Sequence, residues 1–208
     1  MRNGNKDPDR RRKRRRRRIQ AIVIYTAIAV GLAWFFESQA TTTMIFVRHA
    51  EKALIPVDDP GLSAEGQLRA AELARQLVDA DVVAGIDAIY STSYRRTVET
   101  AQPVADALGL AINRYSPDDD DEEVVDAMVR KHKGKIILVV GHSNTVPALI
   151  AALGASKSVP PIAEMEYDNI YLVSIPWFGK TKTIRLRYGT PYTGGPADEN
   201  DAAVNMTK

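Results

Sequence analysis

Cysteine is absent from this chain of 208 residues, and histidine occurs only three times. Without cysteine the protein forms no disulfide, no thiolate metal site and no thiol nucleophile. The absence also fits an exported domain, without requiring export. The sequence shows no cluster of residues with the spacing of metal ligands, so we expect a site that works without a metal ion or another cofactor.

Charge is distributed unevenly, and the formal net charge of +2 describes neither part of the chain. Residues 1–18 hold eleven of the 28 Lys and Arg residues against only Asp7 and Asp9, which gives +9. After residue 18 there remain 17 basic and 24 acidic residues, which gives −7. The folded part is therefore acidic, and an acidic surface argues against nucleic acid as its partner.

Residues 19–36 contain no charged side chain. As a helix this segment would be roughly 27 Å long, close to the ~30 Å of a bilayer's hydrocarbon core. Aromatic residues 34–36 lie at one end, and the arginine run lies at the other. Because basic residues stay on the cytoplasmic side, we expect residues 1–18 in the cytoplasm, one membrane-spanning helix over 19–36, and the rest outside the cytoplasm.

A cleaved signal peptide is the main alternative, because residues 38–40 (Ser-Gln-Ala) resemble a cleavage site, and cleavage after Ala40 would secrete the domain. The apolar segment is longer than the roughly 7–15 residues of a signal-peptide core, which favours an anchor. A third interpretation gives the arginine run its own ligand, nucleic acid or anionic lipid. Both main interpretations export the domain.

Short apolar runs bounded by turn residues predict strands in the remaining chain. They lie at residues 43–47, 86–90, 110–113, 136–140 and 170–175, and an alternating run at 182–188 predicts a final antiparallel strand. Residues 191–208, with Gly, Pro, Asn and acidic residues, predict a disordered tail. The folded domain is therefore expected over residues 41–190.

Four helices are expected between these strands. Ser63 is a suitable N-cap for the first, which runs to about Val78. The others are expected over 95–108, where Pro103 should kink or split the helix, and over 123–131 and 146–153. Strands alternating with helices predict an α/β three-layer sandwich, in which a largely parallel sheet has helices on both faces. In such sheets the active site lies beyond the carboxyl ends of the strands.

Two of the three histidines follow predicted strands directly. His49 comes after the run 43–47, and His142 comes after the run 136–140. Either one alone could be a structural histidine, but two at corresponding strand ends, one of them preceded by Arg48, indicate a site. His132 lies between two lysines and is expected in a solvated loop.

Arg95 and Arg96 lie in the first turn of a predicted helix, where the helix dipole disfavours cations. An anion bound there would relieve the conflict, since guanidinium groups and free backbone N–H groups both bind phosphate. We expect one of the two arginines to face the site and the other to face solvent.

These segments resemble the histidine phosphatase superfamily, which includes phosphoglycerate mutases and acid phosphatases. Residues 48–51 (Arg-His-Ala-Glu) are similar to its Arg-His-Gly signature, and residues 62–67 (Leu-Ser-Ala-Glu-Gly-Gln) to its Leu-Thr-x-x-Gly-x-x-Gln segment. Residues 91–101 resemble its Ser-x-Leu-x-Arg-Ala-x-x-Thr-Ala motif, which aligns Arg96 with the family arginine, and residues 141–144 resemble its Gly-His-Ser/Gly segment. The four matches occur in the family's order and cover most of residues 43–154.

The resemblance implies a role for each matched residue. His49 would attack phosphorus to give a phosphohistidine, which water hydrolyses. Arg48, Arg96 and His142 would surround the phosphoryl oxygens, and Ser143 would contribute to substrate binding. These positive groups make a metal unnecessary. His49 must keep one ring nitrogen unprotonated to attack, so activity should fall at low pH, and the neighbouring cations should lower its pKa.

The sequence departs from the family pattern at two places. Ala50 replaces the family glycine, which is tolerated if its φ is negative. The general acid has no single candidate: the acidic run 118–123 occupies the interval where mutase-like members carry one, although such a run is usually a solvated loop before a helix. The family branch that places an aspartate directly after the second histidine is excluded, because Ser143 stands there.

The sequence thus predicts a metal-independent phosphomonoesterase that acts on an exported phosphorylated small molecule or envelope component. The domain is short for a mutase, which leaves little chain for a lid and favours hydrolysis. One alternative is a phosphohistidine phosphoprotein phosphatase, which would require the domain to face the cytoplasm. The other is a catalytically weak pseudoenzyme that binds phosphorylated ligands at the membrane.

Overall fold

A computed structural model describes residues 8–37, 41–79, 85–155, 159–176 and 178–194, and the chain divides into two compact units, Met1–Ala40 and Thr41–Lys208. The described part of the first unit is one helix, α1 (Pro8–Glu37), whose described side chains are exposed along residues 12–35. By length and composition, Arg12–Phe35 could cross a membrane. The apolar helix is compatible with an anchor or a signal sequence. Its orientation stays a prediction, and the cleavage site at 38–40 lies outside the described residues.

The second unit is built on one six-stranded sheet with the order β3-β2-β4-β1-β5-β6. Strands β1, β2, β3 and β4 are parallel, whereas β5 pairs with β1 in the antiparallel direction and β6 pairs with β5 in the antiparallel direction. The sheet is therefore mixed: β1 to β4 form a parallel part, and β5 and β6 add antiparallel pairs to it. The bounds are β1 (Thr42–Arg48), β2 (Ala88–Ser91), β3 (Ile112–Arg114), β4 (Ile136–Gly141), β5 (Asn169–Ile175) and β6 (Lys182–Arg187).

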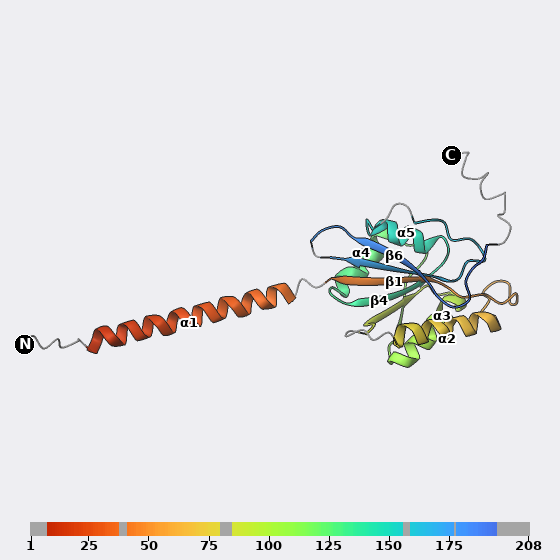
Figure 1. Ribbon diagram of the computed structural model, residues 1–208. Helices are drawn as coiled ribbons and strands as arrows, with labels where there is room; N and C mark the ends of the chain where they lie inside the picture. The colour runs from red at the N-terminus through yellow and green to blue at the C-terminus, as the bar shows by residue number, and fades with distance from the viewer. Residues whose placement is uncertain (1–7, 38–40, 80–84, 156–158, 177, 195–208) are drawn as a thin grey trace, which may run out of the picture. The chain divides into compact units, whose positions relative to one another are not determined.

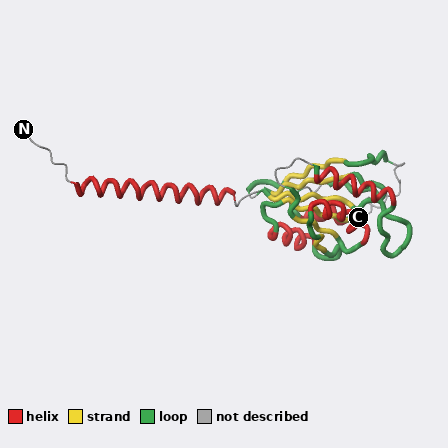
Figure 2. Tube along the Cα trace, turned by 90° about the horizontal axis from the view of Figure 1, so that it is seen from below, coloured by secondary structure: helices red, strands yellow, loops and turns green. Residues whose placement is uncertain are grey.

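Helices cover both faces of this sheet, as the alternation of strands and helices predicts (Figure 1). Helices α2 (Ala64–Val78) and α3 (Arg95–Leu108) pack on one face, and α4 (Asp121–Lys131) and α5 (Thr145–Ala152) pack on the other. Strand β1 serves both layers, since Met44 and Phe46 belong to the core under α4 and α5 while Ile45 and Val47 belong to the core under α2 and α3. Figure 2 shows the strands in yellow and the helices in red from below.

Several element boundaries differ from the predicted ones. Strand β3 begins at Ile112 rather than at residue 110, because the backbone N–H of Leu110 still closes helix α3 on the carbonyl of Ala105. Helix α3 is continuous through Pro103, so of the two predicted effects, a kink or a split, the split does not occur. The ring removes one helical hydrogen bond there, but buried residues on both sides keep the helix packed on the sheet.

The acidic run and His132 frame helix α4. The helix begins at Asp121, two residues earlier than predicted, because Asp120 is its N-cap and accepts from two backbone N–H groups of the first turn. His132, at the other end, is half-buried rather than in a solvated loop, and its Nε2 lies 3.0 Å from the hydroxyl of Tyr90.

The predicted disordered tail falls mostly outside the described residues, since the structure describes only residues 191–194 of it. Within them the backbone N–H of Tyr192 donates to Asp168 Oδ2 at 2.8 Å. The end of the described chain is thus attached to the sheet through β5.

Candidate active site

The carboxyl ends of β1 and β4 bring the two strand-end histidines together. The strands are adjacent and parallel, with Arg48 opposite Gly141, and the backbone N–H of His49 donates to the carbonyl of Gly141 at 2.9 Å. His49 and His142 therefore leave the sheet side by side, with ring centroids 5.4 Å apart. Pairing of two strands separated by almost ninety residues positions both rings.

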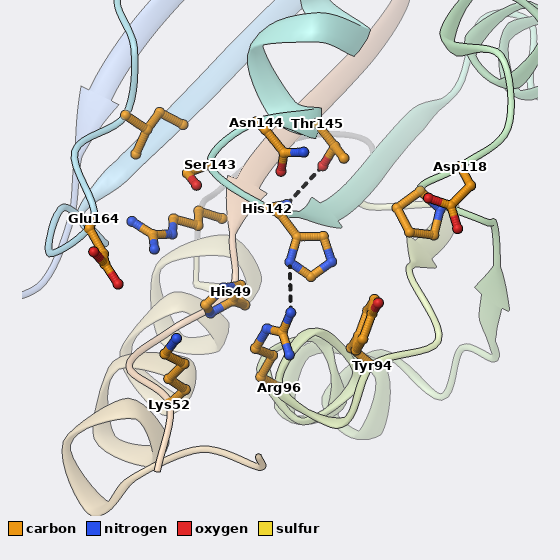
Figure 3. A pocket seen from close by; sticks show the side chains of 13 residues that line it. His49, Lys52, Tyr94, Arg96, Asp118, His142, Ser143, Asn144, Thr145 and Glu164 are labelled. Carbon is orange, nitrogen blue, oxygen red and sulfur yellow. Dashed lines mark hydrogen bonds between the residues drawn. The ribbon is translucent and has the colours of Figure 1, made fainter. Parts of the chain in front are cut away.

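A cavity of about 570 Å³ lies over these strand ends (Figure 3). Most of its lining is polar or charged. The residues that line it are Arg48, His49, Lys52, Tyr94, Arg96, Pro117, Asp118, His142, Ser143, Asn144, Thr145, Ile162 and Glu164. The structure thus gathers all five residues predicted for the site, namely Arg48, His49, Arg96, His142 and Ser143.

The hydrogen bond of His49 determines which of its nitrogens is free. Its Nδ1 lies 2.8 Å from the carbonyl oxygen of Ala50, which can only accept, so Nδ1 carries the proton and Nε2 has the lone pair. Burial, with the charges of Arg48 and the neighbouring cations, lowers the pKa of His49 to about 3, although the bond to Ala50 opposes the shift. The ring is therefore neutral at physiological pH.

Arg48 is buried and its guanidinium is fixed by the loop before β5. Its Nη1 donates to the carbonyls of Ala163 at 2.7 Å and Glu166 at 3.2 Å, and the group lies 4.3 Å from the ring centroid of Tyr167. Burial lowers the pKa of Arg48, while the charges of Tyr167 and Glu164 raise it. The Nε of Arg48 is buried and has no hydrogen-bond partner.

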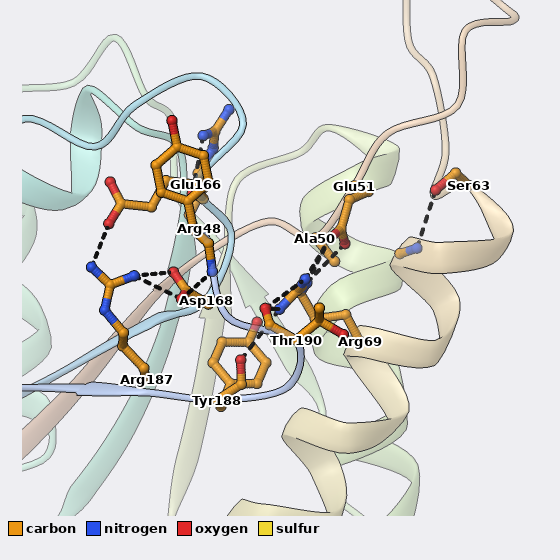
Figure 4. Close-up of polar contacts among 12 residues, drawn as sticks. Arg48, Ala50, Glu51, Ser63, Arg69, Glu166, Asp168, Arg187, Tyr188 and Thr190 are labelled. Atoms are coloured by element: carbon orange, nitrogen blue, oxygen red, sulfur yellow. Dashed lines mark hydrogen bonds and ion pairs between the residues drawn. The ribbon is translucent and has the colours of Figure 1, made fainter. Parts of the chain in front are cut away.

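The loop that holds Arg48 is itself fixed by ion pairs (Figure 4). Arg187 on β6 contacts Asp168 at 2.7 Å and Glu166 at 3.1 Å. The other carboxylate oxygen of Glu166 accepts from the backbone N–H of Ala163 at 3.1 Å. The two antiparallel strands therefore support an arginine that lies on β1.

Arg96 and His142 form the other wall of the cavity. Arg96 Nη2 lies 3.5 Å from His142 Nδ1, and a guanidinium can only donate, so Nδ1 accepts and Nε2 donates to Thr92 Oγ1 at 3.0 Å. Burial and the charges of Arg96 and Arg48 lower the pKa of His142 to about 4. The Arg96 guanidinium also lies 4.4 Å from the ring centroid of Tyr94, and its buried Nε has no partner.

The two adjacent arginines take different directions, as expected. Arg95 is exposed and pairs with Glu99 at 3.0 Å, one turn along the helix. Arg96 lines the cavity. Of the two arginines, the one that faces the site is thus the one that has no carboxylate partner among the described residues.

Ala50 lies in a backbone conformation that suits alanine. No described residue other than glycine has a positive φ, so the absence of the family glycine causes no strain here. Ala50 is fully buried, and its N–H donates to Thr100 Oγ1 at 2.9 Å. The same hydroxyl donates to the carbonyl of Arg96 at 2.7 Å, so Thr100 connects the His49 segment with the helix that carries Arg96.

The segment 62–67 lies outside the cavity and supports the chain that follows His49. Ser63 caps helix α2 by accepting from Gly66 N–H, and its own N–H donates to the carbonyl of Glu51 at 2.9 Å. A Cβ on Gly66 would overlap that carbonyl, which explains the glycine. The carboxylate of Glu51 pairs with Arg69, which also donates to the carbonyl of Thr190 (Figure 4).

Sequence reasoning gave no site role to five residues that line the cavity, namely Lys52, Tyr94, Asn144, Thr145 and Glu164. Tyr94 and Asn144 lie within the matched segments 91–101 and 141–144, and Thr145 begins helix α5. Glu164 lies in a loop without a recognisable motif. Of the acidic run 118–123, only Asp118 lines the cavity, while the members from Asp120 onward cap or begin helix α4. Within the described part of the chain, no three His, Asp or Glu side chains are grouped as metal ligands.

Comparison with known proteins gives one family and a set of similar folds. A family model described as histidine phosphatase superfamily (branch 1) matches residues 44–116. No curated protein matches the chain significantly.

Among solved structures, the protein histidine phosphatase SixA in complex with tungstate is 21% identical, covers 70% of this chain and 96% of its own, and has a TM-score of 0.58. Mycobacterial hydrolase 2 is 13% identical, covers 81% and 98%, and has a TM-score of 0.55. A mycobacterial glucosyl-3-phosphoglycerate phosphatase is 15% identical, covers 64% and 90%, and has a TM-score of 0.51. At these identities the likeness shows a shared fold.

Proposed function

We propose that this chain, which belongs to the histidine phosphatase superfamily, hydrolyses phosphomonoesters through a phosphohistidine on Nε2 of His49. The observation that carries the proposal is the hydrogen bond from His49 Nδ1 to the Ala50 carbonyl, at 2.8 Å. It leaves Nε2 unprotonated in a cavity that also contains two arginines. A neutral imidazole held in one tautomer beside fixed cations has the properties of a nucleophile toward phosphorus.

In the first step a bond forms between Nε2 and phosphorus, and the bond from phosphorus to the ester oxygen breaks. Arg48, Arg96 and His142 contribute by compensating the negative charge on the phosphoryl oxygens. Their positions are fixed before substrate arrives, by the carbonyls that hold Arg48 and by Thr92, which holds His142. In the second step water attacks phosphorus, releases phosphate and restores His49.

The guanidinium groups of Arg48 and Arg96, which both line the cavity, support an anion as its ligand. A bound phosphate dianion would also raise the pKa of His142 from its value of about 4, because it would offset the charges of both arginines. His142 would then donate from both ring nitrogens.

We assign protonation of the leaving oxygen to Glu164, with Asp118 as the second candidate. Both carboxylates line the cavity. The charge of Glu164 acts on Arg48 and on Tyr167, which places it near the phosphoryl pocket. Figure 3 shows the two carboxylates on opposite sides of the histidines.

The substrate class follows from the predicted topology. If helix α1 spans the membrane with its arginine run in the cytoplasm, the cavity meets exported phosphomonoesters or envelope components. The second candidate, a phosphohistidine phosphoprotein phosphatase, is favoured by the fold shared with the protein histidine phosphatase SixA over 96% of that chain. That activity would require the opposite orientation, which a reporter fused to the carboxyl terminus distinguishes.

The test is hydrolysis of p-nitrophenyl phosphate by the full chain in detergent, with and without a chelator. We expect His49→Ala to abolish turnover and chelation to leave it unchanged. His132→Ala is the matched control, because this histidine lines none of the cavity and contacts Tyr90 instead. Full activity in His49→Ala would exclude the phosphohistidine mechanism, and loss on chelation would exclude the metal-free one.

A further inference from the structure

The loop between the His49 segment and helix α2 exposes large apolar side chains to solvent. Leu54, Ile55 and Val57 are 88%, 82% and 84% exposed. Single exposed apolar residues are common on protein surfaces, but a contiguous group of nearly bare ones marks a surface that another apolar surface covers. Figure 1 shows the chain after β1 running into this projecting loop.

The loop is contiguous with the cavity. Lys52, which lines the cavity, directly precedes it. The base of the loop is closed by a bridge between Lys52 and Leu62 and by a hydrogen bond from Ala53 N–H to the Gly61 carbonyl at 2.8 Å. Met165, which follows Glu164 in the sequence, is another exposed apolar residue, at 67%. The exposed apolar side chains of the loop thus begin two residues after a lysine that lines the cavity.

The chain also carries an apolar helix that shortly precedes the folded unit in the sequence. Helix α1 ends at Glu37 and β1 begins at Thr42, so only four residues separate them. Even fully extended, four residues span roughly 14 Å. If α1 is a membrane anchor, the folded unit is tethered to a bilayer, and a bilayer presents phosphates that are attached to apolar chains.

We propose that the substrate is an amphiphilic phosphomonoester of the membrane, whose phosphate enters the cavity while its acyl chains pack against the loop formed by residues 53–59. This inference rests on the proposed function and on the anchor. For a phosphatidate, the bond from phosphorus to the glycerol oxygen breaks as the bond to His49 Nε2 forms. Glu164, the general acid of the proposed function, gives its proton to the glycerol oxygen as the diacylglycerol leaves. Water then attacks phosphorus, returns a proton to Glu164, releases inorganic phosphate and restores His49.

The test compares two substrates that carry phosphate on the same glycerol carbon, dioleoyl phosphatidate in mixed micelles and water-soluble glycerol 3-phosphate. The full chain in nonionic detergent is used, with p-nitrophenyl phosphate as the reference. We expect kcat/KM to be at least about tenfold higher for the phosphatidate, because burial of apolar surface equivalent to one large side chain gives a factor of that size.

The decisive variant combines Leu54→Ser, Ile55→Ser and Val57→Ser. Because the three side chains are exposed, the fold and the hydrolysis of p-nitrophenyl phosphate should be unchanged, while phosphatidate turnover falls by about tenfold or more. Leu68→Ser is the matched control, since this leucine is 75% exposed on helix α2 and should affect neither substrate.

Each outcome has a separate meaning. Absence of p-nitrophenyl phosphate hydrolysis by the native chain would overturn the proposed function itself. If that reaction proceeds but glycerol 3-phosphate is turned over as well as phosphatidate, or the triple variant keeps its phosphatidate activity, the lipid assignment is wrong. If the triple variant instead loses only the dephosphorylation of a phosphohistidine-carrying protein, the loop binds a protein and the proposal is overturned.

Discussion

Acidification should destabilise the folded unit through the two cavity histidines. Both have a pKa below the ordinary value of about 6.5, with His49 at about 3 and His142 at about 4. An unfolded chain takes up protons on these rings near pH 6.5, whereas the folded protein does so only near pH 3 to 4. The stability that this difference provides is complete above pH 6.5 and is lost as the pH falls toward the folded values.

The change in the free energy of unfolding with pH follows from the number of rings that take up a proton only in the unfolded chain. A group that is protonated only in the unfolded state changes the free energy of unfolding by about 1.4 kcal/mol per pH unit. Near pH 5, where both rings are protonated in the unfolded chain and neutral in the folded protein, the two histidines together should therefore give a slope of about 3 kcal/mol per pH unit. Carboxylates add a loss of the same sign at lower pH. In Asp168, for example, burial raises the pKa, but the hydrogen bonds from Tyr192 and Arg187 outweigh it and lower the pKa overall.

Urea unfolding of residues 41–208, followed by circular dichroism at half-unit steps from pH 7 to pH 4, measures this slope. His49→Gln and His142→Gln should each reduce it by about 1.4 kcal/mol per pH unit, because each removes one titrating ring. Tungstate at about 100 times its Kd should add about 2.7 kcal/mol of stability and flatten the slope, because an anion favours protonated histidine. Equal slopes in the native protein and both variants would refute the electrostatic account of this cavity.

Three further predictions concern the surroundings of the cavity. Gly66→Ala should lower the free energy of unfolding by about 1 to 3 kcal/mol through overlap with a backbone carbonyl, whereas Gly85→Ala, which meets open space, should be neutral in the same urea assay. Thr100→Val should cost about 1 to 3 kcal/mol by leaving a buried N–H unpaired and should reduce kcat, and Thr100→Ser, which keeps the hydroxyl, should restore both. Glu164→Gln should slow the hydrolysis of alkyl phosphates at least about tenfold. It should leave the hydrolysis of p-nitrophenyl phosphate unchanged, because the p-nitrophenolate leaving group needs no general acid. If Asp118→Asn shows that pattern instead, the general acid is Asp118.

The histidine pair could be predicted from the sequence because parallel strands converge at one edge of a sheet. His49 and His142 each follow a buried apolar run directly, so the alternation of strands and helices was enough to place both rings at the same edge. The predicted helix layers on the two faces of the sheet are also confirmed. They could be predicted because the apolar periodicity of each helix is a local property of its sequence.

Contacts between distant loops could not be predicted in this way. Arg48 is held by carbonyls 115 and 118 residues further along the chain, in a loop with no regular pattern. Glu164 enters the cavity from that same loop. The antiparallel addition of β5 beside β1 brings the loop there, and a strand's apolar pattern does not determine the direction of its pairing.

The choice between the two adjacent arginines, by contrast, has a local physical cause. Arg95 has Glu99 one turn further along the helix, and side chains four residues apart lie on the same face. Glu99 is also held in place, because its other oxygen accepts from the backbone N–H of Leu62 at 2.6 Å. Arg96 has Thr100 at the corresponding position, which carries no charge and instead bonds Ala50. The helix therefore neutralises one arginine within its own surface and leaves the other to be compensated by an anion in the cavity, which is where a phosphoryl group would lie.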